Sequence, residues 1–151
     1  MIRIVAIGKK HESWIIDGLE RYEKRLRKPF ACEWVHLPHS SSEGFSARNS
    51  ESEAILSRLR SNEYVILLDE IGKNIDSPAL SRLLETQFTS GRSVTIIIGG
   101  AYGVNDALLA RADFIWSLSH LVFPHQLVRL LLAEQLYRAQ EIAAGGKYHH
   151  I

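Results

Sequence analysis

Residues Ile96–Val104 read IIIGGAYGV, and this stretch is the part of the chain that decides the fold. Three β-branched apolar residues run directly into Gly99 and Gly100, and a third glycine follows at Gly103. A short apolar run that ends in glycine is typical of a buried strand. The glycines have two explanations: a tight strand-to-helix turn with positive φ, or bare backbone against which a ligand lies.

Outward from this stretch, apolar runs alternate with helical patterns along the chain. The apolar runs predict buried strands at 2–8, 31–37, 64–69, 93–98 and 114–119. Apolar residues at helical spacing predict helices at 15–26, 78–90, 105–112 and 124–144. We expect a loop at 39–50, followed by a helix that a Ser50–Glu53 capping box opens. This alternation predicts an α/β fold, with a mostly parallel sheet covered by helices on both faces.

The residues at the helix ends refine this prediction. Ser77 before Pro78 predicts a helix N-cap, and Asn105 predicts another. Gly91 and Gly145 are expected to end the helices that precede them.

Composition narrows the class of protein. The 151 residues suffice for one domain, 1–151, and 46% hydrophobic with 23% charged residues is typical of a globular chain. No apolar run approaches the roughly 20 residues of a membrane span, and no signal peptide is expected. A single cysteine, Cys32, fits a reducing cytoplasm. The net charge of +1 is low for a chain that binds nucleic acid by charge alone.

In parallel sheets ligands bind beyond the carboxyl ends of the strands, and three of these ends carry unusual residues. The segment at 67–73, LLDEIGK, places carboxylates at a strand end, where they serve a ligand or simply a turn. The second is the glycine segment. The third, 116–129, is an apolar loop that either lines a pocket or packs under the sheet.

The glycine spacing G-G-x-x-G matches neither a dinucleotide fingerprint nor a P-loop, and no Lys or Arg follows before Arg111. A triphosphate would therefore lack its usual countercharge. A carboxylate, bare backbone and an apolar loop suit an adenosine that carries a neutral or cationic chain. S-adenosylmethionine has this character. No histidine or cysteine spacing typical of a metal site is present, so no metal is expected.

Four segments carry a resemblance to a known family: LLDEIGK, IIIGGAYG, SLSHLVFPHQLVRLLLAEQLYRAQEI and the terminal YHH. In this order they resemble the ribosomal RNA large subunit methyltransferase H family, of the SPOUT class. The resemblance covers essentially the whole chain. It implies a C-terminal trefoil knot, a homodimer with cofactor sites near the subunit interface, and methylation of N3 of a pseudouridine in large-subunit (23S) ribosomal RNA.

The resemblance also implies site residues. The cofactor-binding residues would be Leu68, Gly99 and the loop Leu118, Ser119, His120, Leu121, Val122 and Phe123. We assign Gly100 and Gly103 to the same backbone surface. The loop after Gly100 reads Ala101–Tyr102, where relatives carry other residues, but the glycines are kept.

Methyl transfer to a ring nitrogen requires loss of its proton, or donors that stabilise the resulting anion. The candidates are His149 as base or hydrogen-bond partner, Tyr148 as stacking face, and Arg129 and Arg138 as charge stabilisers. A disordered tail is the alternative explanation of KYHHI, and Glu134 and Glu141 are alternative ion-pair partners of the arginines. For His125 we favour a structural role at the start of its helix.

Candidate RNA-binding residues are Lys9, Lys10, Arg138 and His150. His150 stands where many relatives have Arg or Lys and is a weaker cation. The low net charge suggests that an assembled ribosome, with its shape and many contacts, is the substrate.

Two rival functions stay open. One is a SPOUT methyltransferase that acts on another RNA such as tRNA. The length of the chain argues against it, because 151 residues leave no room for an RNA-binding extension beside the catalytic fold. The other is a non-catalytic, ribosome-associated RNA-binding factor, against which stand the intact glycines Gly99, Gly100 and Gly103.

Overall fold

The computed structural model describes residues 1–150 and contains one five-stranded sheet. The elements in chain order are β1 (Ile2–Ile7), α1 (Ser13–Glu23), β2 (Cys32–Leu37), α2 (Gly44–Leu56), β3 (Tyr64–Lys73), α3 (Ser77–Thr89), β4 (Val94–Ile98), α4 (Asp106–Arg111), β5 (Phe114–Trp116) and α5 (His125–Ala143). The strand order is β2-β1-β4-β3-β5, and all neighbouring strands are parallel. The predicted fold class is therefore confirmed, and the strand order is consistent with the trefoil knot, which stays a prediction.

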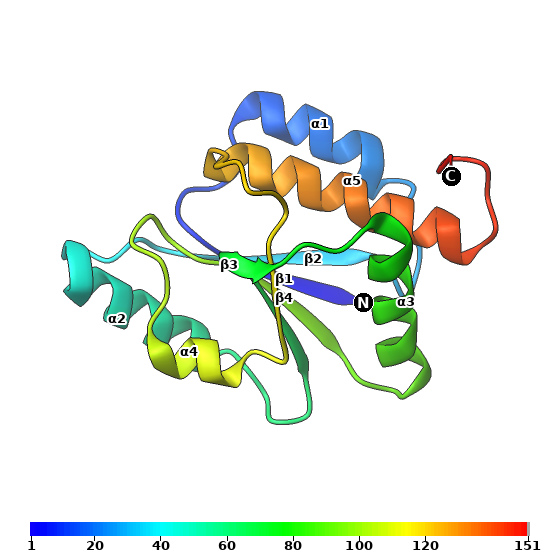
Figure 1. The fold of residues 1–151 in the computed structure, drawn as a ribbon. Coiled ribbons are helices and arrows are strands. Elements are labelled where there is room, and N and C mark those ends of the chain that lie inside the picture. The colour runs from blue at the N-terminus through cyan, green and yellow to red at the C-terminus, as the bar shows by residue number, and fades with distance from the viewer. Residues whose placement is uncertain (151) are drawn as a thin grey trace.

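Helices cover both faces of the sheet, as predicted (Figure 1). Alternation within β1 shows the division: Ile2, Ile4 and Ala6 pack into the core under α1, α3 and α5, while Val5 and Ile7 pack into the core under α2 and α4. These two faces bury almost every apolar side chain of the central strands, which is why those strands read as continuous apolar runs.

The predicted loop at 39–50 and the capping box at Ser50 are wrong. Helix α2 begins at Gly44, and its N-cap is Glu43. The sequence is polar because part of this helix's inward face is polar: Ser52 is fully buried and its Oγ accepts a hydrogen bond from Asn105 N at 2.9 Å. A polar inward face leaves no apolar stripe for periodicity to detect.

Other helix ends agree with the sequence more closely. The side chain of Asn105 caps α4 by accepting from Leu108 N, and Gly91 and Gly145 end their helices with φ of 75° and 71°. The N-cap of α3 is Asp76 rather than Ser77, because the Asp76 carboxylate accepts from Ala79 N at 2.8 Å.

Candidate active site

A cavity of about 330 Å³ opens at the carboxyl ends of β3, β4 and β5, and we call it the Leu68 cavity. Its size falls within the usual range for small-molecule sites. Its walls come from strand ends, from the loop between β5 and α5, and from the first turn of α5. They comprise Leu68, Asp69, Glu70, Ile98, Gly99, Ala101, Trp116, Ser117, Leu118, Ser119, Leu121, Val122, Phe123, His125 and Val128.

Strand β3 forms one wall because it does not stop where the sequence suggested. Its pairing with β5 shifts register between Leu68 and Lys73, so the residues between them bulge out. Asp69 and Glu70 lie on this bulge and line the cavity. The strand then returns to β5 so closely that a Cβ at Gly72 would lie 2.5 Å from the Ile115 carbonyl oxygen. The LLDEIGK segment is thus a bulged strand rather than a turn between two elements. The Asp69 carboxylate nevertheless accepts a hydrogen bond from Ile71 N at 3.0 Å, the local contact that the turn explanation expects.

Each of the three glycines after β4 is required for a different structural reason. Gly103 has φ of 78° and its N–H donates to Gly100 O at 3.1 Å, so here the tight-turn explanation is confirmed. A Cβ at Gly100 would lie 2.3 Å from Glu51 Oε1, which makes the buried Glu51 carboxylate the group that approaches this backbone. Only Gly99 lines the Leu68 cavity.

Small polar residues hold the loop between β5 and α5 in shape. Asn74 Nδ2 donates to Ser117 O at 2.8 Å, Ser117 Oγ donates to Ser119 O at 2.9 Å, and Leu121 N donates to Ser119 Oγ at 3.0 Å. These bonds leave Leu121 and Val122 70% and 81% exposed at the cavity mouth. The loop therefore lines a pocket, one of the two alternatives that the sequence left open.

A second cavity, of about 540 Å³, lies on the other side of this loop, and we call it the His149 cavity. It shares Trp116, Leu118, Ser119 and Phe123 with the Leu68 cavity, and its far wall includes Gln135 of α5 and His149 of the tail. A thin wall of loop residues therefore separates the candidate cofactor residues from the candidate catalytic histidine.

The C-terminal tail packs onto α5, and the explanation of a disordered tail is wrong for the part described. Arg138 Nη1 lies 3.1 Å from His149 Nδ1, and the Arg138 guanidinium carbon lies 4.7 Å from the Tyr148 ring centroid. Glu134 Oε1 accepts from Arg138 Nε at 2.7 Å, which confirms the alternative ion pair for this arginine and is the main cause of its raised pKa. Tyr148 also contacts Tyr137 edge to face, with ring centroids 4.8 Å apart.

This contact fixes the proton positions on His149. A guanidinium only donates, so Nδ1 accepts from Arg138, and in the neutral ring the proton sits on Nε2. In this arrangement the free nitrogen of His149 is a hydrogen-bond donor rather than a base.

Arg129 lines neither cavity. Its side chain is 1% exposed, and its Nη1 donates to Lys9 O at 2.8 Å. Among the ion pairs within residues 1–150 none includes Arg129, so its predicted acidic partners on α5 do not pair with it.

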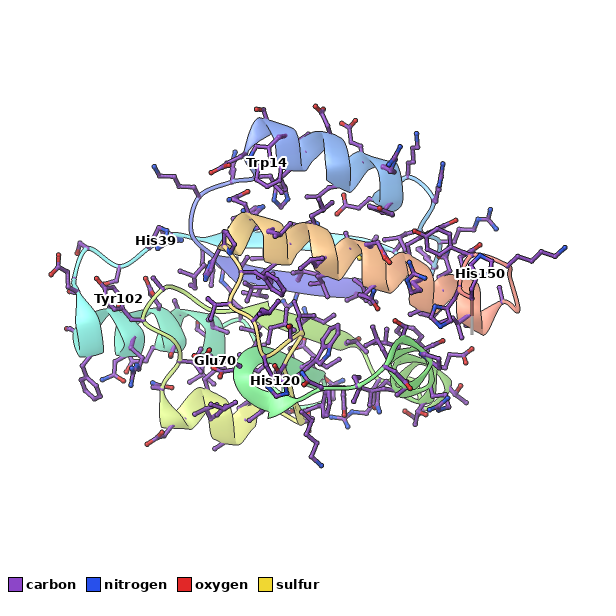
Figure 2. All side chains as sticks on the ribbon, turned by 45° about the horizontal axis from the view of Figure 1, so that its top comes forward. Trp14, His39, Glu70, Tyr102, His120 and His150 are labelled. Atoms are coloured by element: carbon purple, nitrogen blue, oxygen red, sulfur yellow. The ribbon has the colours of Figure 1, made fainter. Side chains whose placement is uncertain are left out.

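The remaining predicted residues are spread over the surface. Lys9, Lys10, His120 and His150 are exposed. Figure 2 shows His150 at the far end of α5, away from His120 and Glu70. Gly100, Gly103 and His120 do not line the Leu68 cavity, so their role in cofactor binding stays a prediction.

Sequence reasoning missed several lining residues. His125 and Val128 face the Leu68 cavity from α5, and Trp116 separates the two cavities. Burial lowers the pKa of His125, and Arg129 adds to this, so the ring is neutral at pH 7. Its position directly after Pro124 at the end of an apolar loop was the available signal. Within the described part of the chain, no cluster of His, Cys, Asp or Glu has metal-binding geometry. No described helix is long and apolar enough to cross a membrane.

Comparisons with known proteins agree with this geometry. A family model described as "Predicted SPOUT methyltransferase" matches residues 1–149. A protein from Haemophilus influenzae Rd KW20, titled a probable methylase family protein, superposes with a TM-score of 0.55 at 17% identity, over 95% of this chain and 66% of that one. The chain belongs to the SPOUT methyltransferases, since their family model matches nearly all of it.

Sequence relatives narrow the class further. The ribosomal RNA large subunit methyltransferase H of Hahella chejuensis is 38% identical over 98% of this chain and 97% of its own length. The protein of the same name from Acetivibrio thermocellus is 41% identical over 98% of each chain. This chain belongs to the ribosomal RNA large subunit methyltransferase H family.

Proposed function

We propose that this protein transfers the methyl group of S-adenosylmethionine to N3 of a pseudouridine in large-subunit ribosomal RNA. Family membership supports the reaction class and the RNA. The observation that carries the choice of cofactor is the charge of the Leu68 cavity. Asp69 and Glu70 line it and no Lys or Arg does, so it suits an adenosyl ligand that is cationic rather than a nucleoside triphosphate.

The residues of the Leu68 cavity bind the cofactor in this proposal. Leu68, Leu118 and Phe123 supply apolar walls for an adenine, and Gly99 lets its backbone approach the ligand. When bound, S-adenosylmethionine supplies a methyl carbon already activated by a sulfonium. The strand ends hold the donor rigidly, which is the main requirement of an in-line displacement.

The tail supplies the stabilisation that the nucleophile needs. Loss of the N3 proton leaves negative charge on the ring nitrogen and the neighbouring carbonyl oxygens. Loop residues separate His149 from the Leu68 cavity of its own subunit, so in the proposed homodimer it reaches the cavity of the second copy. There its Nε2–H donates a hydrogen bond to such an oxygen, and the Arg138 charge behind it strengthens this bond. The N3 proton passes to solvent, and N3 of the resulting anion would then accept the methyl group as that group's bond to sulfur breaks.

A homodimer, cytoplasmic location and a single catalytic domain complete the proposal. Leu121 and Val122 project at the cavity mouth, and Trp14 and Ile16 are 53% and 43% exposed on α1. A second copy that covers such side chains would explain their exposure. Sedimentation analysis at micromolar concentration tests this, and a monomer would contradict it.

Calorimetry tests the cofactor site. Leu118→Ala removes a wall of the Leu68 cavity and should weaken S-adenosylmethionine binding about 10-fold or more, from the roughly 1.5–3 kcal/mol of a buried leucine. Ile71→Ala is the control, because Ile71 is 70% exposed and does not line the cavity. Equal affinity in the two variants would place the cofactor elsewhere.

Substitutions of His149 separate the donor from the base. His149→Gln keeps an acceptor for Arg138 and an outward N–H donor, so it should retain much of the methyl transfer that His149→Ala loses. Equal loss in both variants would favour a base. Mass spectrometry of ribosomal RNA and tRNA from cells with and without the protein then identifies the substrate. Loss of the modification from tRNA alone would favour the tRNA alternative.

A further inference from the structure

Among the described residues 1–150, Arg129 is a buried cation that forms no ion pair with a carboxylate. Its side chain is 1% exposed, and its Nε is buried and has no hydrogen-bond partner. The contacts of the guanidinium are to the Lys9 carbonyl, at 2.8 Å, and to His11 Nδ1, at 3.4 Å. A buried charge of this kind is costly unless an anion offsets it, so the missing counterion calls for an explanation.

Further nitrogen atoms surround the guanidinium at the carboxyl ends of β1 and β2. The rings of His11 and His36 lie 4.8 Å apart, and His36 Nδ1 is buried and without a partner. Since Arg129 only donates, the weak contact at His11 Nδ1 leaves the His11 proton on Nε2, as a donor. Lys9 and Lys10 are exposed on the loop that carries these groups.

The chain bends at Gly8 to bring this cluster together. Gly8 has φ of 120°, and a Cβ there would lie 3.0 Å from His39 Nε2 and 3.7 Å from Arg129 Nη2. A third histidine, His39, therefore lies near the guanidinium, on the loop after β2. His11 and His36 are neutral at pH 7. Burial, then His36 and the Arg129 charge, lower the pKa of His11 to about 4, and burial and the Arg129 charge lower the pKa of His36.

The acidic side chains near the cluster are committed elsewhere. Glu12 accepts a hydrogen bond from Trp14 Nε1 at 2.6 Å. Glu51 accepts from Ser40 N at 2.9 Å and lies 3.8 Å from His39 Nδ1. Neither forms an ion pair with Arg129. Burial lowers the pKa of Arg129 and the Glu12 charge offsets part of this shift, but the three cations Lys9, Lys10 and Arg129 still outnumber the two carboxylates.

We propose that Lys9, Lys10, His11 and His36, backed by Arg129, form a binding site for an anionic oxygen group, and that a phosphodiester of the RNA substrate occupies it. The RNA as occupant rests on the proposed function. Arg129 follows His125 by one helical turn, and His125 lines the Leu68 cavity. The site therefore lies beside the cofactor cavity, where the backbone of the target strand would pass. The cofactor's own carboxylate is the other source of the same chemistry.

A titration with inorganic phosphate tests the site without any enzymatic reaction. The ring C2–H resonances of His11 and His36 should shift with millimolar phosphate, and their titration midpoints should move to higher pH. In the variant Lys9→Gln/Lys10→Gln the phosphate affinity should fall about 5-fold or more. The control is Lys28→Gln, at an exposed lysine on the loop between α1 and β2, which should change nothing. If phosphate does not shift the His11 and His36 resonances of the native protein, the proposal is overturned. Arg129 would then have only the structural role of donating a hydrogen bond to the Lys9 carbonyl.

Kinetics and binding then distinguish the two sources of the anion. If RNA supplies it, Lys9→Gln/Lys10→Gln and His36→Phe should raise the KM for ribosomal RNA about 5- to 10-fold and leave S-adenosylmethionine affinity unchanged. The double lysine variant should also reduce the slope of log kcat/KM against log salt by about 1 to 2. If the cofactor carboxylate supplies it, S-adenosylmethionine binds more weakly while methylthioadenosine, which lacks that carboxylate, does not. That result would overturn the RNA assignment. Phosphate binding without methyl transfer would refute the proposed function and leave the anion site intact.

Discussion

Replacing Gly100 by alanine tests what the glycine pair is for. A Cβ at this position would lie 2.3 Å from Glu51 Oε1 and 3.2 Å from Ile7 Cγ2, and Glu51 is only 4% exposed. The carboxylate cannot keep its place beside an added methyl group. Gly100 has no positive φ, so the substitution adds no backbone strain and the clash alone determines the outcome.

The magnitude follows from what the carboxylate must give up. If Glu51 moves, it loses the hydrogen bond from Ser40 N, and a bond to a charged group contributes about 1.5–3 kcal/mol. If it stays, the region is overpacked, which costs about 1–3 kcal/mol. We expect Gly100→Ala to lower the free energy of unfolding by about 1–3 kcal/mol, whichever of the two occurs. For a chain of this length, that lowers the Tm by about 2–12 °C.

A double-mutant cycle assigns this cost to Glu51. In a Glu51→Ala background the methyl group has room, so Gly100→Ala should cost less than about 1 kcal/mol. In a Glu53→Ala background, one half-turn away at an exposed position, it should keep its full cost. Urea unfolding of the single and double variants measures both. Additive costs of Gly100→Ala and Glu51→Ala would refute the reasoning and return the glycine to a ligand role.

Three further results are expected. Gly72→Ala should lower the free energy of unfolding by about 3 kcal/mol or more, measured by thermal unfolding, which is a larger loss than for Gly100→Ala. The added Cβ would lie 2.5 Å from the Ile115 backbone oxygen, and no side chain there can rotate away. The pKa of His11, lowered to about 4 by burial, means that the folded protein binds fewer protons than the unfolded chain between about pH 6.5 and 4. Its free energy of unfolding should therefore fall as pH drops through that window, by about 1–2 kcal/mol after solvent screening of the half-buried ring, and urea unfolding of His11→Gln should show a smaller fall. Asp76→Ala removes the α3 cap and should cost about 0.5–2 kcal/mol in the same assay, whereas Asp76→Asn should cost less.

The fold was predictable where local chemistry and tertiary burial agree. The sheet was visible because its strands are buried on both faces, so Ile96–Ile98 and their neighbours read as unbroken apolar runs. Helix α2 was not visible at its start, because its buried residues include Glu51 and Ser52, whose partners lie on distant segments. A helix that buries polar side chains against distant segments lacks the periodic apolar residues from which a helix is predicted.

The candidate site was predictable in position and less so in detail. The rule that ligands bind at the carboxyl ends of parallel strands located the Leu68 cavity, and 118–123 lines it as expected except at His120. The contact between Arg138 and His149 joins residues eleven positions apart through a chain reversal at Gly145 and Gly146. Nothing in the spacing shows that reversal bringing the imidazole back onto α5, so the choice between base and donor needed the structure.

The glycines illustrate how a motif is overread. Gly103 serves a turn, Gly100 makes room for Glu51, and only Gly99 faces the cavity. Two of the three would be kept by a protein that had lost its cofactor, because the fold itself needs them. Intact glycines therefore do not separate a methyltransferase from a non-catalytic relative. The exposure of Leu121 and Val122, 70% and 81%, bears on the partners of this loop instead, because apolar side chains exposed at a cavity mouth are typical of a surface that a ligand or a second subunit covers.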